Sequence, residues 1–184
     1  MPEDARIIEQ TSLWVKSVIV GYNFCPFAYR EVERGSIRYR VDQSNQIAHC
    51  LETMVAEYDH LDSHPETETT LIIFPELLAE FKDFTGFIEL AEALLTEQGY
   101  TGEYQLASFH PEYQFADAPA DDPANYTNRS PYPTLHIIRE TSIENAVAGI
   151  SNPERIPERN IKVARNLGSK VLQGILDRCH ALKE

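Results

Sequence analysis

The sequence is poor in the residues that usually cross-link small domains or bind metals. It has three cysteines, Cys25, Cys50 and Cys179, in 184 residues, and no two of them form a Cys-x-x-Cys pair. An odd number of scattered cysteines excludes a disulfide framework or a zinc knuckle as the main source of stability. We therefore expect a domain stabilised by its hydrophobic core, which a chain of this length can supply.

Basic residues are also scarce. Lys and Arg number 16 against 29 Asp and Glu, which gives a formal net charge of −13. Proteins that bind nucleic acid or anionic membranes need a basic surface that displaces counterions, so this balance argues against both partners. The sequence also lacks an apolar run of about 20 residues that could span a bilayer, and no apolar stretch follows its acidic start. These absences predict a cytoplasmic protein.

Three motifs that mark common enzyme classes are missing. The chain has no Gly-x-x-x-x-Gly-Lys-Ser/Thr loop, no Gly-x-Gly-x-x-Gly turn and no Gly-x-Ser-x-Gly elbow. P-loop nucleotide hydrolysis, Rossmann cofactor binding and α/β-hydrolase chemistry are therefore poorly supported. No tight ligand spacing such as His-Glu-x-x-His is present either. We expect neither a cofactor nor a metal.

What the chain does contain is an alternation of helical and strand patterns. Apolar residues three and four apart predict helices, and short β-branched apolar runs predict strands. This predicts helices at 5–20, 47–58, 78–95, 142–148 and 157–175, and strands at 37–41, 69–74, 103–110 and 134–139. Two β-α-β units require parallel neighbouring strands, and the last two strands are expected to be antiparallel. We predict one α+β or α/β domain over 1–184, with helices, including N- and C-terminal ones, on a mixed four-stranded sheet, ferredoxin-like in outline.

The ends of the predicted strands indicate where a site should lie. In open α/β sheets, ligands bind beyond the carboxyl ends of parallel strands. Those ends are Asp42, Glu76 and His110, and the 23-residue segment 111–133 leaves from the same edge. If the fourth strand is antiparallel, the short helix after it returns the chain so that 152–160 reaches this edge as well. Several polar segments are then expected to converge on one rim.

The segment 111–133 is longer than most structureless loops, and such loops are usually functional or disordered. It has five prolines, which lower the entropy lost on ordering, and aromatic residues that can pin it to the body. We expect an ordered loop that either grips a ligand as a lid or covers an exposed sheet edge. Its candidate ligand-binding side chains are Asn125, Asn128, Arg129 and Ser130.

Two residues are candidates for catalysis. His110 ends the third strand, and histidine titrates near neutral pH, so it could act as an acid or base. Cys25 precedes Pro26 at a bend after the first helix and could be a nucleophile if a cationic neighbour lowers its pKa. The alternative interpretations are that His110 only bonds backbone groups and that Cys25, between Phe24 and Phe27, is a small core residue.

A basic cluster stands at the predicted start of the last helix. Arg155, Arg159 and Asn160 lie where the backbone N–H groups and the helix dipole favour an anion. Together with Arg129 of the loop they could clamp a phosphate or a carboxylate. The alternative is that these cations pair with the acidic helices, within the chain or across a dimer.

Three functional hypotheses follow from these residues. The first is an enzyme or binder for a small anionic metabolite, in which Glu76 and the loop side chains complete the site around His110. The second is a non-catalytic interaction module or homodimer that uses the aromatic loop and the basic helix. The third is a redox protein that uses the thiol of Cys25.

Four motifs in combination resemble a known family. They are NFCPF at 23–27, FHP at 109–111, NRSPYP at 128–133 and RIPERN at 155–160. Over nearly its whole length the chain is similar to a bacterial family catalogued as a domain of unknown function, number fourteen-fifteen. The resemblance implies a single-domain bacterial protein, and it transfers neither an activity nor a catalytic residue.

Overall fold

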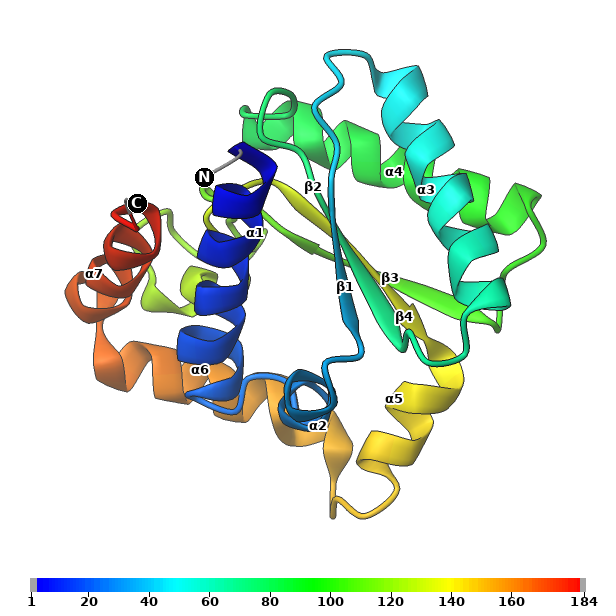
Figure 1. The fold of residues 1–184 in the computed structure, drawn as a ribbon. Helices are drawn as coiled ribbons and strands as arrows, with labels where there is room; N and C mark the ends of the chain where they lie inside the picture. Colours follow the sequence, from blue (N-terminus) through cyan, green and yellow to red (C-terminus); the bar gives the residue numbers. More distant parts are fainter. Residues whose placement is uncertain (1–2, 183–184) are drawn as a thin grey trace.

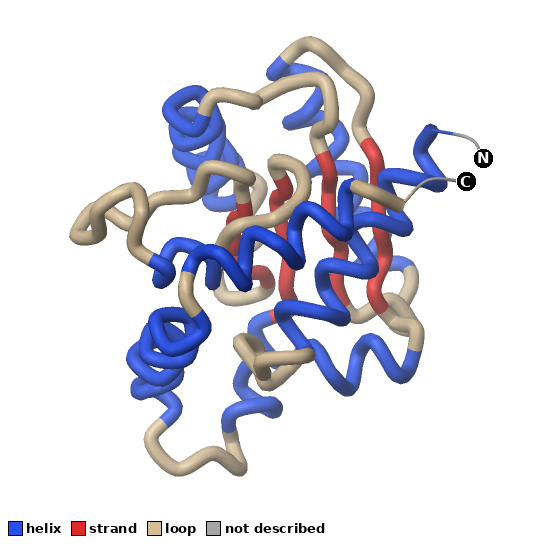
Figure 2. Tube along the Cα trace, turned by 90° about the vertical axis from the view of Figure 1, so that its left-hand side faces the viewer, coloured by secondary structure: helices blue, strands red, loops and turns tan. Residues whose placement is uncertain are grey.

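Four strands form one mixed sheet through the middle of the molecule (Figures 1 and 2). In this computed structural model, which describes residues 3–182, they are β1 (Ile37–Val41), β2 (Thr69–Ile73), β3 (Tyr104–Phe109) and β4 (Thr134–Arg139). Their order is β1-β2-β4-β3, with β1 parallel to β2 and β4 antiparallel to both of its neighbours. The predicted α+β class and mixed four-stranded sheet are confirmed.

The place of β4 differs from the expectation. The β-α-β pattern predicts β2 and β3 as neighbours, but β4 lies between them. Leu135 and Ile137 of β4 are fully buried, whereas β3 carries the exposed Gln105, so the more apolar strand takes the interior position. The element order βαβαβ, followed by a long loop and β4, also differs from the βαββαβ order of a ferredoxin-like sheet. The carboxyl ends of β1, β2 and β3 nevertheless share one edge, as predicted.

Helices cover both faces of the sheet. Within residues 3–182 they are α1 (Glu3–Trp14), α2 (Ala28–Arg34), α3 (Ile47–Ser63), α4 (Phe81–Glu97), α5 (Glu140–Val147), α6 (Ile156–Leu167) and α7 (Ser169–His180). Figure 1 shows α3 and α4 on one face, and α1, α6 and α7 on the other. None of these helices has the length and apolar character needed to cross a bilayer.

Each face has its own hydrophobic core. On one side, Tyr58 of α3 and Phe87 of α4 pack with Leu135 of β4. On the other side, Trp14 of α1 and Leu172 of α7 belong to a second cluster. The strands supply both cores because their side chains alternate between the two faces.

Two expected helices have a different backbone course. The last one is divided at Gly168, whose φ of 80° and ψ of 154° end α6 and start α7. A glycine reaches this conformation without steric cost. The first helix continues beyond α1 as a π-helical segment, Val15–Val20. Both changes keep the apolar stripes buried, since Val15 and Val18 pack in the same cluster as Leu172.

The short helix α2 has no counterpart in the sequence-based prediction. Ala28 packs in the cluster of Trp14, and the buried Glu31 accepts a hydrogen bond from Ser36 Oγ at 2.6 Å. A helix of seven residues is too short to show a clear 3.6-residue period, which explains why the pattern does not reveal it.

A buried carboxylate ties the sheet to α3. Arg38 Nε donates to Glu57 Oε2 at 2.7 Å, and its Nη2 donates to Oε1 at 3.2 Å. Thr70 Oγ1 donates to the same carboxylate at 3.2 Å. Glu57 is only 3% exposed, so these donors from β1 and β2 replace the water that its carboxylate loses on burial.

We predict that Glu57→Ala lowers the free energy of unfolding by about 2–4 kcal/mol, because the half-exposed guanidinium and the buried Thr70 hydroxyl lose their partner. Urea unfolding at neutral pH measures the change. Glu52→Ala, an exposed position on the same helix, is the matched control and should change stability by less than about 0.5 kcal/mol. Equal effects of the two substitutions would contradict the role given to Glu57.

Candidate functional site

One candidate site is a hollow beside β3 and the first turns of α6. Its volume is about 480 Å³, within the range of about 300–1,000 Å³ typical of ligand pockets. We call it the α6–β3 hollow. Five polar or thiol side chains line it: Cys25, Gln105, Thr127, Asn128 and Asn160. The rest of the lining is apolar and includes Phe109, Phe115, Ile156 and Ile161.

Strand alternation places β3 at this hollow. Gln105, Ala107 and Phe109 line it, whereas Tyr104 and Leu106 pack into the core beneath α3 and α4. Since successive strand side chains point to opposite faces, one strand forms a wall of the hollow and a part of the opposite core.

The first turns of α6 are hydrogen bonded to the bend after the π-helical segment. Asn160 Nδ2 donates to the carbonyl oxygen of Phe24 at 2.6 Å. Arg159 Nη1 donates to the carbonyl oxygens of Tyr22 and Asn23 at 2.9 and 2.7 Å, and to Asn160 Oδ1 at 3.0 Å. These bonds hold α6 against the bend that carries Cys25 and thereby close one side of the hollow.

Asn128 fixes the long loop to β3 at the opposite wall. Its Nδ2 donates to the carbonyl oxygen of Ser108 at 3.2 Å, and its own carbonyl oxygen accepts from the N–H of His110 at 3.1 Å. Its Oδ1 accepts from Thr127 Oγ1 at 3.1 Å. The loop therefore continues the hydrogen bonding of the strand and brings two polar side chains to the hollow.

Cys25 lies where this hollow meets a second, smaller cavity. Its thiol is half-buried, and burial raises its pKa, while the backbone N–H groups of Phe27 and Ala28 oppose that shift. The side chain is therefore a neutral thiol at neutral pH. Ile19, Cys25 and Phe109 line both spaces, so these three residues form the boundary between them.

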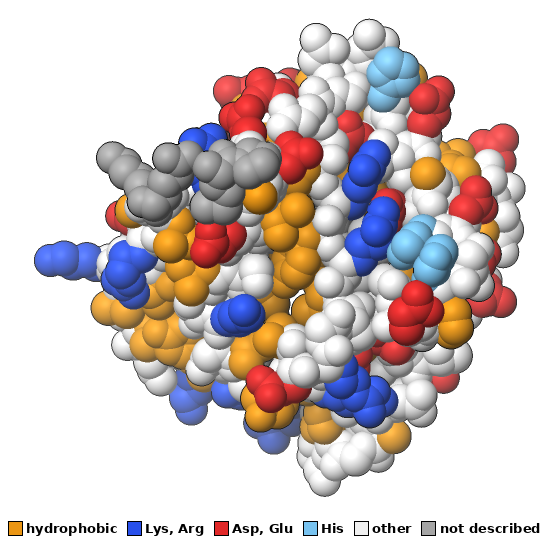
Figure 3. All heavy atoms as spheres, viewed as in Figure 1, with side chains coloured by type: hydrophobic (Ala, Val, Ile, Leu, Met, Phe, Trp, Pro, Cys, Tyr) orange, Lys and Arg blue, Asp and Glu red, His pale blue; other side chains and the backbone are white. Residues whose placement is uncertain are grey.

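The smaller space, which we call the inner cavity, has a volume of about 40 Å³ and is almost wholly apolar. Residues of α1 and β1 are among its walls, including Trp14 and Ile37. In Figure 3, hydrophobic side chains gather in a furrow between the same two elements. The indole Nε1 of Trp14 is buried and has no hydrogen-bond partner, which is uncommon for a buried donor.

His136 of β4 also lines the inner cavity. Its Nε2 lies 2.7 Å from Thr69 Oγ1, and that hydroxyl donates to the carbonyl oxygen of Ile137 at 2.5 Å. Because the hydroxyl has a single proton, Nε2 carries the proton of the imidazole and Nδ1 is the unprotonated nitrogen. Burial lowers the pKa of His136 to about 3, so the ring is neutral.

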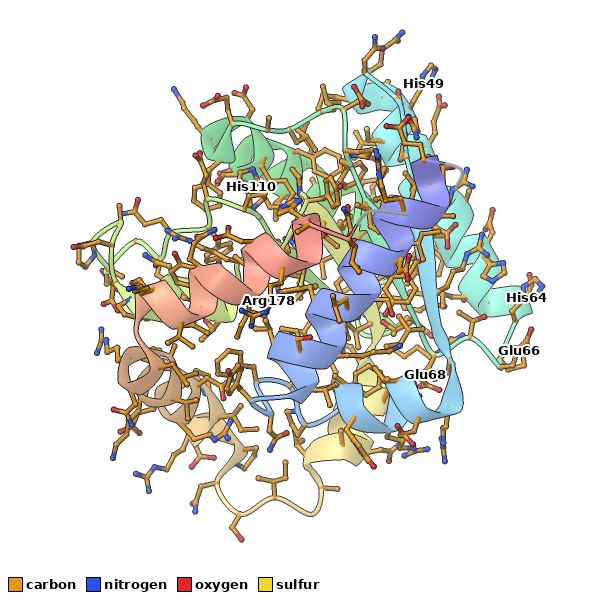
Figure 4. The ribbon with its side chains drawn as sticks, turned by 60° about the vertical axis from the view of Figure 1, so that its left-hand side comes forward. His49, His64, Glu66, Glu68, His110 and Arg178 are labelled. Carbon is orange, nitrogen blue, oxygen red and sulfur yellow. The ribbon has the colours of Figure 1, made fainter. Side chains whose placement is uncertain are left out.

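His110 lies elsewhere, inside the molecule near the start of α4 (Figure 4). It is fully buried, Nδ1 accepts from the N–H of Glu112 at 3.0 Å, and Nε2 lies 2.9 Å from the carbonyl oxygen of Leu78. Phe81 and Phe84 contact the ring, and burial lowers its pKa. With both nitrogens bonded to the backbone, this geometry favours the structural interpretation over acid–base catalysis.

The remaining loop candidates bond within the loop itself. Asn125 is fully buried, with Oδ1 accepting from the N–H of Phe115 at 3.0 Å and Nδ2 donating to the carbonyl oxygen of Pro119 at 2.9 Å. Arg129 lies over the ring of Tyr126 and donates to the carbonyl oxygens of Tyr113 and Ala120. Ser130 Oγ donates to the carbonyl oxygen of Tyr132. They order the segment rather than line the hollow.

Three basic residues, one directly before α6 and two within it, lie beside the hollow on the neighbouring face. Arg155, Arg159 and Lys162 line a shallow depression of about 360 Å³, in which Arg155 Nε lies 3.5 Å from Glu158 Oε2. Glu76 follows β2 and is exposed, and it lines neither the hollow nor the inner cavity. The single predicted rim is therefore two places: the sheet edge with His110 and Glu76, and the sheet face with Cys25, Asn128 and Asn160.

The inner cavity is not evident from the sequence. Its walls come from separate elements: Trp14 from α1, Thr69 from β2 and His136 from β4. No local sequence signal could have found it, because only the insertion of β4 beside β2 brings His136 next to Thr69. Within the part of the chain that the structure describes, no cluster of three or more His, Cys, Asp or Glu has the arrangement of a metal site.

A family model described as "Protein of unknown function (DUF1415)" matches residues 6–174. The chain belongs to this family. Comparisons with curated proteins and with solved structures found no match. The DUF1415 match includes every residue that lines the α6–β3 hollow and the inner cavity.

We predict that methyl methanethiosulfonate modifies one thiol per folded chain and three after denaturation. Cys25 is half-buried, whereas Cys50 and Cys179 are at most 1% exposed. Because the pKa of Cys25 is raised, the reaction should be slower than that of free cysteine at the same pH. Mass spectrometry counts the adducts. The folded Cys25→Ser variant should show none, and rapid modification of several thiols would contradict the burial described here.

The neutral His136 predicts a loss of stability in acid. The unfolded chain binds a proton at this histidine below its ordinary pKa of 6.5, whereas the folded protein does not until near pH 3. Acid therefore favours the unfolded chain, by about 2 kcal/mol between pH 7.5 and pH 5 for this residue. Urea unfolding of His136→Gln at both pH values should show a correspondingly smaller decrease. His49→Gln, at an exposed position, should retain the wild-type decrease; the same result for both variants would argue against this assignment.

Proposed function

We propose that this protein binds a small molecule with an apolar body and an anionic group, and that the α6–β3 hollow is the binding site. The observation that carries the proposal is the convergence of Cys25, Asn128 and Asn160 from three distant segments on one mostly apolar hollow. Few polar groups in a concave apolar lining are the usual features of a small-molecule site.

The apolar body is supported by the walls of the hollow. Phe109 of β3, Phe115 of the loop and Ile161 of α6 approach it from three sides. A flat or extended hydrocarbon of modest size would bury its surface against these side chains, at about 25 cal/mol for each Å² removed from water.

The anionic group is supported by the start of α6. Arg155, Arg159 and Lys162 lie on the face next to Ile156 and Asn160, and Arg159 is hydrogen bonded to Asn160 itself. The helix dipole at the start of α6 adds a further preference for negative charge, although Ile156 N–H donates to the carbonyl oxygen of Pro153 and Pro157 has no N–H. A carboxylate or phosphate at this rim would be attracted locally although the whole chain is acidic.

Other features favour a small molecule over the alternative partners. The large exposed hydrophobic side chains within residues 3–182 are Tyr29, Leu90 and Val171, which lie on three helices well separated in Figure 1. Scattered apolar side chains are typical of a monomer surface, whereas docking surfaces are contiguous. The neutral thiol of Cys25 gives the redox hypothesis less support than a low-pKa thiolate would. The cytoplasmic location stays a prediction.

The test is a thermal-shift screen with short alkyl and aryl carboxylates and phosphates, each paired with its neutral amide or alcohol. A ligand at 100 times its Kd adds about 2.7 kcal/mol of stability, which raises the Tm of a chain of this size by about 5–10 °C. We expect acids to shift the Tm more than their neutral partners.

Variants locate the site. Ile161→Trp should reduce the shift because it fills the hollow, and the double variant Arg155→Gln/Lys162→Gln should reduce the difference between acids and neutral partners. Arg178→Gln, at an exposed position of α7 (Figure 4) that does not line the hollow, is the control and should bind as the wild type does. No shift with any compound would refute the proposal, and equal shifts for each acid and its neutral partner would remove the anionic group from it.

A further inference from the structure

The inner cavity has no part in the proposed function so far, yet it adjoins the hollow. The two spaces share Ile19, Cys25 and Phe109 as lining residues. A molecule lying in the hollow along Phe109 therefore has the inner cavity directly beyond the thiol of Cys25.

We propose that the inner cavity is a second binding subsite, which takes the apolar end of the molecule held in the α6–β3 hollow. This inference rests on the proposed function and extends it to a ligand class: a small acid whose anionic group lies at α6 and whose slender hydrocarbon tail passes Cys25. The side chains of Ala28, Leu71 and Phe109 would contact the end of that tail.

The size of the cavity limits the tail. A volume of about 40 Å³ has room for about three water-sized groups, since one water needs roughly 10–15 Å³ of such space. A terminal propyl or a smaller group fits, whereas a second aromatic ring does not. The cavity should therefore distinguish acids by length and by the width of the tail.

The chemistry of the walls agrees with an apolar occupant. Apolar cavities stay dry and accept hydrocarbons or xenon. The polar side chains at the wall are Cys25, Thr69 and His136, and the last two bond to each other. Trp14 Nε1–H is a buried donor without a protein partner.

Trp14 also provides the measurement, because it is the only tryptophan of the chain. Xenon is a heavy-atom quencher of indole emission, and it needs no anionic group to enter an apolar cavity. We expect xenon pressure to quench Trp14 in the wild type. Ala28→Val, which fills part of the cavity, should reduce the quenching severalfold, and Val15→Ile is a milder second variant if the first folds poorly. Ala48→Val, at an exposed position of α3, is the matched control and should leave the quenching unchanged.

The second measurement uses n-alkanoates from acetate to octanoate. Each methylene that is buried should tighten binding about fourfold, and acids long enough to enter the inner cavity should change Trp14 emission. In Ala28→Val the gain in affinity with each added methylene should stop one or two methylenes earlier than in the wild type. The affinity of the shorter acids should be unchanged. Ala48→Val should follow the wild-type series.

The two measurements separate the inference from the function on which it rests. Quenching without alkanoate binding would overturn the ligand class and with it the subsite. A second outcome is that alkanoates of every length bind wild type and Ala28→Val equally strongly and do not change Trp14 emission. This outcome would overturn the subsite and leave the proposed function intact. The third outcome is that, in Ala28→Val, the affinity stops rising at a shorter acid and xenon quenches Trp14 less. This outcome supports both the ligand class and the subsite.

Discussion

The hydrogen bonds between the first turns of α6 and the bend at residues 22–24 are the interaction on which the candidate site depends. Asn160 and Arg159 bond three successive backbone carbonyls. Without them α6 would have no fixed distance from the bend, and Cys25 would have no fixed place beside β3. The site is therefore built from backbone groups of one segment and side chains of another, about 135 residues later in the chain.

The sheet supplies the second constraint. Inserting β4 between β2 and β3 makes β3 an edge strand, and the face of that edge strand forms a wall of the hollow. The same insertion sets His136 beside Thr69. One topological choice thus produces both a hollow at the margin of the sheet and a small apolar cavity beside His136.

Much of the fold could be predicted from the pattern of residues. β4 begins and ends where the alternation at 134–139 places it, and the buried run at 69–73 forms a strand as expected. The break at Gly168 could not be predicted, because an apolar stripe continues across it and only packing of α7 against α1 requires the bend. The order of strands likewise depends on contacts between distant segments, which local patterns do not encode.

The same distinction applies to the site. The motifs around Cys25, Asn128 and Asn160 were recognisable as a polar, irregular set, and the hollow brings those three together. Asn125 has the same residue type as Asn128 and lies in the same loop, and His110 directly precedes that loop. Their polar atoms nevertheless bond backbone groups, those of the loop itself and that of Leu78 before α4. Residue type and position alone do not distinguish a side chain that lines a pocket from one that orders the loop beside it.

The π-helical segment Val15–Val20 has a consequence for how this chain tolerates insertions and deletions. It packs one more residue into a turn than an α-helix does, through i to i−5 hydrogen bonds such as those from Gly21 to Lys16 and from Phe24 to Ile19. Removing one residue would restore a regular helix and rotate everything on one side of it by about 100°. Trp14 and Cys25 would then no longer line one common cavity, so the inner cavity depends on the length of this segment as well as on the residues that line it.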